Sequence, residues 1–69
     1  MTYTIKCTLD DDAFAMMRRA KLFCDGDEKA TAHCTDIRDG IEVWTVETKV
    51  DIQDRLVYDP NVISYDSKP

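Results

Sequence analysis

The stretch TYTIKCTLDDDAFAMMRRAKLFC, residues 2–24, changes from the period of a strand to the period of a helix and so decides the fold class. Its first part, residues 2–9, alternates strictly between apolar and polar side chains, as in a strand with one buried face. Asp10 can cap the helix that follows, in which apolar residues from Ala13 to Cys24 recur at helical spacing. The turn Asp25-Gly26-Asp27 should end this helix, because glycine suits the position after a helix C-terminus.

The next part of the chain predicts a hairpin. Residues 29–37 and 41–50 have the composition of two strands, joined by a turn that contains Gly40. We expect a type I turn with a bulge at Gly40. This register places Ile37 opposite Ile41, Cys34 opposite Trp44 and Ala32 opposite Val46. A two-residue turn, the alternative, would place Thr35 opposite Trp44.

Residues 51–58 fit two structures. Asp51 could cap a short helix that carries Ile52 and Leu56, but the apolar residues also alternate as in a strand. A turn at residues 59–61 and a short strand at 62–65 should follow. We therefore expect one α+β domain, residues 1–69, with the order β-α-β-β-x-β: a mostly antiparallel sheet of three to four strands, with one main helix on one face. Its core should contain Ile5, Leu9, Met17, Phe23, Trp44 and Val46.

The composition indicates a small acidic protein with no membrane segment. Fourteen Asp and Glu against nine Lys and Arg give a formal charge of -5 and a pI near 4.6. No stretch approaches the roughly 18 apolar residues that a membrane helix needs. Three cysteines, an odd number, favour free thiols in a reducing cytoplasm.

The sequence contains no motif typical of an enzyme or a metal protein. Cys7, Cys24, Cys34 and His33 are the soft ligands, and they lack the close pairs of a zinc site. Residues 25–28 hold only fragments of a calcium loop. No cofactor and no catalytic activity are expected. Direct nucleic-acid binding is also disfavoured, because the net negative charge repels phosphates despite a basic helix face, which should point to solvent and consists of Arg18, Arg19 and Lys21.

The acidic residues are the candidate binding groups. They could form a negative face that mimics a phosphate backbone. Alternate residues of a strand lie roughly 6.6 Å apart, which is close to the rise of about 6.8 Å over two nucleotides of one DNA strand. Asp36 and Glu42 should lie across from each other on the hairpin, and Asp39 at its tip. The competing interpretation is that Asp serves only helix capping, turns and solubility. The predicted partner-binding residues are Asp10, Asp11, Asp12, Asp25, Asp27, Glu28, Asp36, Asp39 and Glu42.

In length, acidity, free cysteines and helix-on-sheet pattern, the chain resembles the small acidic anti-CRISPR proteins that phages encode. The likeness leans towards inhibitors of type I systems, including type I-C. These inhibitors share no sequence motif, so the resemblance assigns no residue. It implies a non-enzymatic DNA mimic that blocks the DNA-binding groove of a type I Cascade complex, or a similar basic protein surface, in the cytoplasm of a bacterial host.

An apolar patch is the alternative binding surface. In the preferred register, Ile37, Ile41 and Val43 share the sheet face opposite Trp44. If the helix covers the Trp44 face, this patch would be exposed and could bind a partner in a small interaction module. The acidity would then serve solubility and capping alone.

Overall fold

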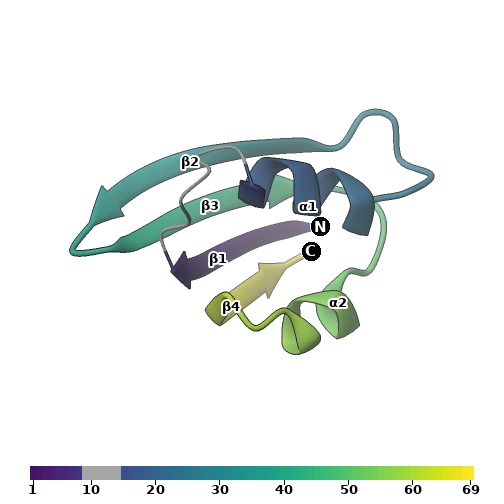
Figure 1. The fold of residues 1–69 in the computed structure, drawn as a ribbon. Coiled ribbons are helices and arrows are strands. Elements are labelled where there is room, and N and C mark those ends of the chain that lie inside the picture. Colours follow the sequence, from purple (N-terminus) through teal and green to yellow (C-terminus); the bar gives the residue numbers. More distant parts are fainter. Residues whose placement is uncertain (9–14) are drawn as a thin grey trace.

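The computed structural model describes residues 1–8 and 15–69, which form a four-stranded antiparallel sheet and two helices (Figure 1). The strand order is β2-β3-β1-β4, so β1 and β3 lie in the centre. The predicted α+β class is confirmed, and the order β-α-β-β-α-β is that of the split βαβ, or ferredoxin-like, arrangement. The elements are β1 (Thr2–Thr8), α1 (Ala15–Phe23), β2 (Thr31–Arg38), β3 (Ile41–Glu47), α2 (Gln53–Tyr58) and β4 (Val62–Lys68).

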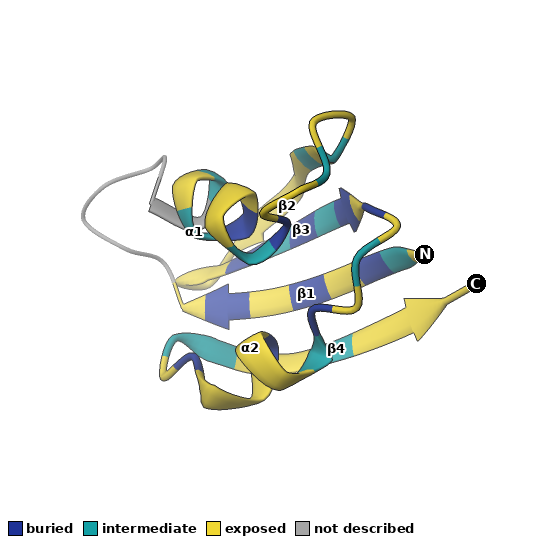
Figure 2. Cartoon of the chain, turned by 90° about the vertical axis from the view of Figure 1, so that its right-hand side faces the viewer, coloured by how far each residue is buried: buried dark blue, intermediate teal, exposed yellow. Residues whose placement is uncertain are grey.

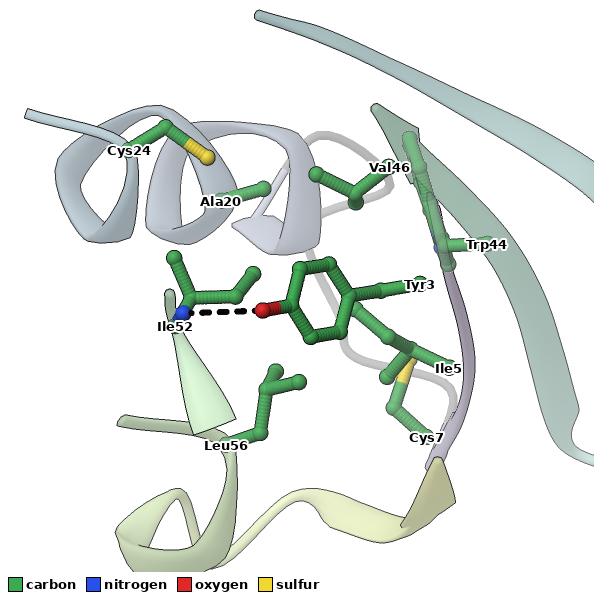
Figure 3. Packing of buried hydrophobic residues seen from close by; sticks show 9 residues of the cluster. All are labelled: Tyr3, Ile5, Cys7, Ala20, Cys24, Trp44, Val46, Ile52 and Leu56. Atoms are coloured by element: carbon green, nitrogen blue, oxygen red, sulfur yellow. Dashed lines mark hydrogen bonds between the residues drawn. The ribbon is translucent and has the colours of Figure 1, made fainter. Parts of the chain in front are cut away.

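The core lies between one face of the sheet and the two helices (Figures 2 and 3). The alternation in β1 buries Tyr3, Ile5 and Cys7 completely. The Tyr3 hydroxyl accepts a 3.2 Å hydrogen bond from the backbone amide of Ile52, the residue before α2 (Figure 3). The buried apolar residues are Tyr3, Ile5, Cys7, Ala20, Cys24, Trp44, Val46, Ile52 and Leu56, and Met17 and Phe23 pack partly buried against them.

The segment with two possible structures is a helix. The side chain of Asp51 accepts a 3.0 Å hydrogen bond from the backbone amide of Gln53, but Ile52 occupies the N-cap position, so the predicted cap at Asp51 is wrong by one residue. Ile52 and Leu56 are four residues apart, so both side chains point at the core and are buried. Of the two structures that the sequence left open for this segment, the chain adopts the short helix.

The hairpin between β2 and β3 combines features of both predicted registers. Asp39 and Gly40 have φ angles of 54° and 76°, and they form a two-residue turn that pairs Arg38 with Ile41. The predicted bulge at Gly40 is wrong, as is the pairing of Ile37 with Ile41. A register shift between Cys34 and Asp36 leaves Thr35 unpaired, so the bulge lies within β2. Beyond it, the predicted pairs Cys34–Trp44 and Ala32–Val46 are confirmed.

Several element ends differ from the predicted ones. β2 begins at Thr31, not at residue 29, and β3 ends at Glu47, not at residue 50. β4 continues to Lys68, beyond the predicted end at residue 65. The predicted cap at Asp10 and the core residue Leu9 lie outside the described residues. In the part of the chain that the structure describes, neither helix has the length and apolar character of a membrane span.

Candidate functional site

The sheet has one face that neither of the two described helices covers (Figure 2). The side chains of β1 at Thr2, Thr4 and Lys6 point to this open face, because their neighbours at positions 3, 5 and 7 point to the core. Strand pairing places three acidic and three basic side chains on the open face: Asp36, Glu47, Asp66, Lys6, Arg38 and Lys68. Their charges balance, so the surplus of acid is not located there.

The open face also lacks the groups that bind RNA in other four-stranded sheets. RNA-recognition domains stack bases on aromatic side chains of the sheet. In the four described strands, Tyr3, Trp44 and Tyr65 all pair on the helix-covered face, where Tyr3 and Trp44 are buried. The open face therefore has neither aromatic residues nor excess positive charge for a nucleic acid.

Acidic side chains gather in a shallow groove of about 960 Å³ at one end of the molecule, here called the loop groove. The exposed carboxylates of Asp25 and Glu28 line it in the loop after α1, and exposed Glu47 lines it at the end of β3. Lys29 and Lys49 are the lysines in its wall. The complete lining is Met1, Thr2, Asp25, Gly26, Asp27, Glu28, Lys29, Glu47, Thr48 and Lys49.

Asp27 holds the two sides of the loop groove together. Its carboxylate accepts hydrogen bonds from the Thr48 hydroxyl at 2.8 Å, the Lys49 amide at 3.0 Å and the Lys29 amide at 3.1 Å. Chiefly the Lys49 bond, and then the Thr48 bond, lower the pKa of Asp27. This predicted binding residue therefore has three hydrogen bonds within its own chain, which favours a structural role.

Two predicted residues lie at the other end of the molecule, near the hairpin tip (Figure 1). Asp39 is exposed in the turn, in a left-handed conformation that Asp tolerates better than most residues. Asp36 is exposed on β2 and lies 3.9 Å from the Arg38 guanidinium, at the limit of an ion pair. Both carboxylates are accessible to a partner.

Glu42 is not a surface residue, and the prediction that it faces Asp36 is wrong. It pairs with Ile37, points to the core and is only 2% exposed. Its carboxylate accepts a 3.0 Å hydrogen bond from the indole nitrogen of Trp44. The bulge at Thr35 turns Asp36 to the open face, whereas Glu42 lies two residues before Trp44 on β3 and so faces the core with it.

The predicted acidic surface is therefore divided. Asp25 and Glu28 lie at one end, and Asp36 and Asp39 near the other. Asp10, Asp11 and Asp12 lie outside the described residues, which contain eleven of the fourteen acids and all nine Lys and Arg. Asp25, Glu28, Asp39, Glu47, Asp54 and Asp66 are exposed and form no ion pair within the described residues.

The predicted apolar patch is also divided. Ile37 pairs with Glu42 and so points to the helix side of the sheet, whereas Ile41 and Val43 point to the open face. These three residues do not form one surface. A feature that the sequence did not predict is a hollow of about 380 Å³ between Phe23 of α1 and Tyr58 of α2, since residues 51–58 had no single predicted structure.

The thiols are free, and no metal cluster is present among the described residues. Cys7 and Cys24 are buried, and Cys34 is exposed on β2. Burial raises the pKa of Cys7 to about 11, with a smaller contribution from Glu42. No three His, Cys, Asp or Glu side chains in the described ranges are placed to hold a metal ion.

Comparison of the chain with protein-family models, curated proteins and solved structures gives no match. The split βαβ arrangement serves many unrelated functions, so fold alone assigns none. Function must therefore be inferred from the chain's own surface.

Proposed function

We propose that this chain is a non-enzymatic inhibitor that occupies the nucleic-acid-binding surface of a basic partner protein. Its exposed carboxylates would take the positions of phosphates. Binding would exclude nucleic acid by competition, and the opposite charges of the two proteins would accelerate their association. No catalytic residue or cofactor is required for this mechanism.

The observation that carries the proposal is the placement of exposed carboxylates at both ends of the long axis. Asp25 and Glu28 lie at the loop end, and Asp39 at the hairpin tip (Figure 1). The longest extent of the molecule is 31 Å. One turn of B-DNA spans about 34–36 Å. The long axis of the molecule, which bounds the separation of the two acidic ends, is thus slightly shorter than one helical turn of DNA.

The resemblance to phage anti-CRISPR proteins supplies the first partner to test. A type I surveillance complex holds DNA in a positively charged groove and operates in the bacterial cytoplasm. The open sheet face is compatible with this role, since its balanced charges and lack of aromatic residues give it no means of binding the nucleic acid itself.

The test is a competition experiment with a purified type I complex and labelled target DNA. The chain should displace DNA, and displacement should weaken sharply as salt rises. The double variant Asp25→Lys/Glu28→Lys should weaken inhibition by about tenfold or more, because two attractive contacts become repulsive. Asp39→Asn should weaken it less, because it removes one charge and adds none.

Asp66→Lys is the control matched to the single variants Asp25→Lys and Glu28→Lys, which change the net charge by the same amount, because Asp66 lies on the open face between balanced charges. It should retain inhibition. If Asp66→Lys weakens inhibition as much as Asp25→Lys or Glu28→Lys, inhibition depends on net charge and not on the position of the acidic residues. Full inhibition by the loop double variant would refute the proposal. Circular dichroism of each variant establishes that the fold is intact.

A further inference from the structure

The hollow between the two helices is lined by Phe23, Asp54, Arg55 and Tyr58, and is called here the helix hollow. Leu56 of α2 points into the core, so Arg55 and Tyr58, three residues apart, share the side of α2 that borders the hollow. Phe23 reaches it from the last turn of α1 and is partly buried against the core. The helix hollow belongs neither to the acidic ends nor to the core.

The aromatic wall of the helix hollow is unusually exposed. Tyr58 is 84% exposed, although it is a large aromatic residue, and Leu22, next to Phe23 in α1, is 70% exposed. Exposed apolar side chains beside a concave surface often mark protein interfaces, where tyrosine is a frequent energetic centre. The folding of the isolated chain gives no reason for Tyr58 to be there, because its side chain contributes little buried area.

The charges on the helix hollow indicate what could cover it. Asp54 and Arg55 are adjacent in sequence, both are exposed, and neither forms an ion pair within the described residues. One acid and one base cancel, so the rim favours neither a basic nor an acidic partner. A surface with neighbouring charges of opposite sign is complementary to itself under a two-fold rotation.

We propose that the helix hollow is the interface of a symmetric homodimer. In an isologous interface, if residue i contacts residue j of the second copy, then j contacts i. Asp54 of each copy would therefore pair with Arg55 of the other, and the two Tyr58 rings would fill the paired hollows. Homodimerisation also adds buried apolar area to a 69-residue domain, which alone buries only about 60% of its unfolded surface.

The test is sedimentation equilibrium of the full chain, without any partner, over a range of concentrations. The wild type should show a reversible monomer–dimer equilibrium. Asp54→Arg and Arg55→Asp should each raise the dimer dissociation constant by about tenfold, because each places like charges across the interface. The double variant Asp54→Arg/Arg55→Asp exchanges the charges and should restore the dimer. Tyr58→Ser should abolish it.

Val57→Ser is the matched control, since Val57 is an exposed neighbour on α2 that does not line the helix hollow. It should leave the equilibrium unchanged. Tyr58 and the two charges are exposed, so these variants do not remove core contacts, and circular dichroism checks their helicity. A wild type that is monomeric at every concentration overturns the proposal, as does a double variant that dimerises no better than either single variant.

This inference can fail independently of the proposed function. The dimer is measured without a partner, and inhibition is measured with variants outside the helix hollow. High salt should weaken the dimer less than the inhibition, because the Tyr58 contacts do not depend on charge, whereas the Asp54–Arg55 pairs and the carboxylate contacts of inhibition do. A negative result for the dimer therefore does not contradict the proposed inhibition, and a negative result for inhibition does not contradict the dimer.

Discussion

Arg19 of α1 donates a 2.8 Å hydrogen bond from its Nε to the carboxylate of Asp59, just beyond α2. The Asp59 side chain is 4% exposed and that of Arg19 is 24% exposed, so this is a largely buried ion pair. The second carboxylate oxygen of Asp59 accepts a 2.9 Å bond from the Asn61 amide. Asp59 thus joins α1 to the turn before β4. The prediction that Arg19 points to solvent is therefore wrong.

Arg19→Ala should destabilise the fold by about 3 kcal/mol, because it leaves the Asp59 carboxylate buried without its cation. Urea unfolding of the two proteins measures this difference. Lys21→Ala, at an exposed position of the same helix, is the control and should change stability by less than about 0.5 kcal/mol. Adding Asp59→Asn to Arg19→Ala should recover part of the loss. Equal stability of Arg19→Ala and Lys21→Ala would contradict the importance of this pair.

Asp27→Asn should be less stable than the wild type at neutral pH, and the difference should shrink in acid. The pKa of Asp27 lies below its ordinary value of 3.8, because the charged form accepts bonds from Lys49, Thr48 and Lys29. A lowered pKa in the folded state gives stability that is present above the unfolded value and lost as the pH falls through the folded value. The wild type therefore loses this contribution below about pH 4, whereas Asn has none to lose.

Thermal unfolding at neutral pH and near pH 3 measures this effect, because these pH values lie on either side of the ordinary Asp pKa of 3.8. Asp25→Asn, two residues away and exposed, is the control and should not change the pH dependence. If the stability difference between the wild type and Asp27→Asn is the same at both pH values, the three hydrogen bonds do not favour the charged carboxylate.

The sequence was sufficient to predict the elements whose pattern of apolar residues depends only on neighbouring positions in the chain. The alternation in residues 2–8 and the helical spacing before Cys24 each bury one face, and the structure contains both β1 and α1. Residues 51–58 remained ambiguous because Ile52 and Leu56 fit both periods. The choice between them depends on a distant contact: Tyr3 of β1 accepts a hydrogen bond from the Ile52 amide, and this contact is not visible in the sequence around α2.

The candidate site was less predictable, because burial of an acid depends on register. The sequence analysis placed a bulge at Gly40, whereas the structure places it at Thr35. The bulge at Thr35 turned Asp36 to the open face and separated Ile37 from Ile41, whereas Glu42 faces the core with Trp44 in either register. Composition also could not distinguish Asp25, whose carboxylate is exposed, from Asp27, whose carboxylate holds two loops together.

Thiol labelling of the folded chain should modify Cys34 well before the other two cysteines. Cys34 is exposed on β2, whereas Cys7 and Cys24 are buried in the core. The thiolate is the reactive form, and burial raises the pKa of Cys7 to about 11, which suppresses its reaction further. Mass spectrometry should detect one fast adduct, absent in Cys34→Ser, and three adducts in urea. Rapid labelling of Cys7 in the folded chain would contradict this prediction, because it would show that the reagent reaches the core.

Glu42→Ala should destabilise the fold by about 1–3 kcal/mol, because it leaves the buried indole nitrogen of Trp44 without its acceptor. Glu42→Gln keeps an acceptor oxygen at the same distance along the side chain, so it should retain most of the stability. Trp44 is the one tryptophan of the chain, and its fluorescence reports on this contact directly. Urea unfolding followed by that fluorescence compares the three proteins.

A comparison of Glu42→Gln with Asp39→Asn distinguishes an acidic residue of the core from an acidic residue that binds the partner. Because Glu42 is 2% exposed, Glu42→Gln should inhibit DNA binding by a basic partner as well as the wild type does, although it removes one negative charge. Asp39→Asn removes the same charge from an exposed turn and should inhibit less. If Glu42→Gln weakens inhibition as much as Asp39→Asn at equal stability, then either Glu42 reaches the surface in the complex or inhibition depends only on net charge.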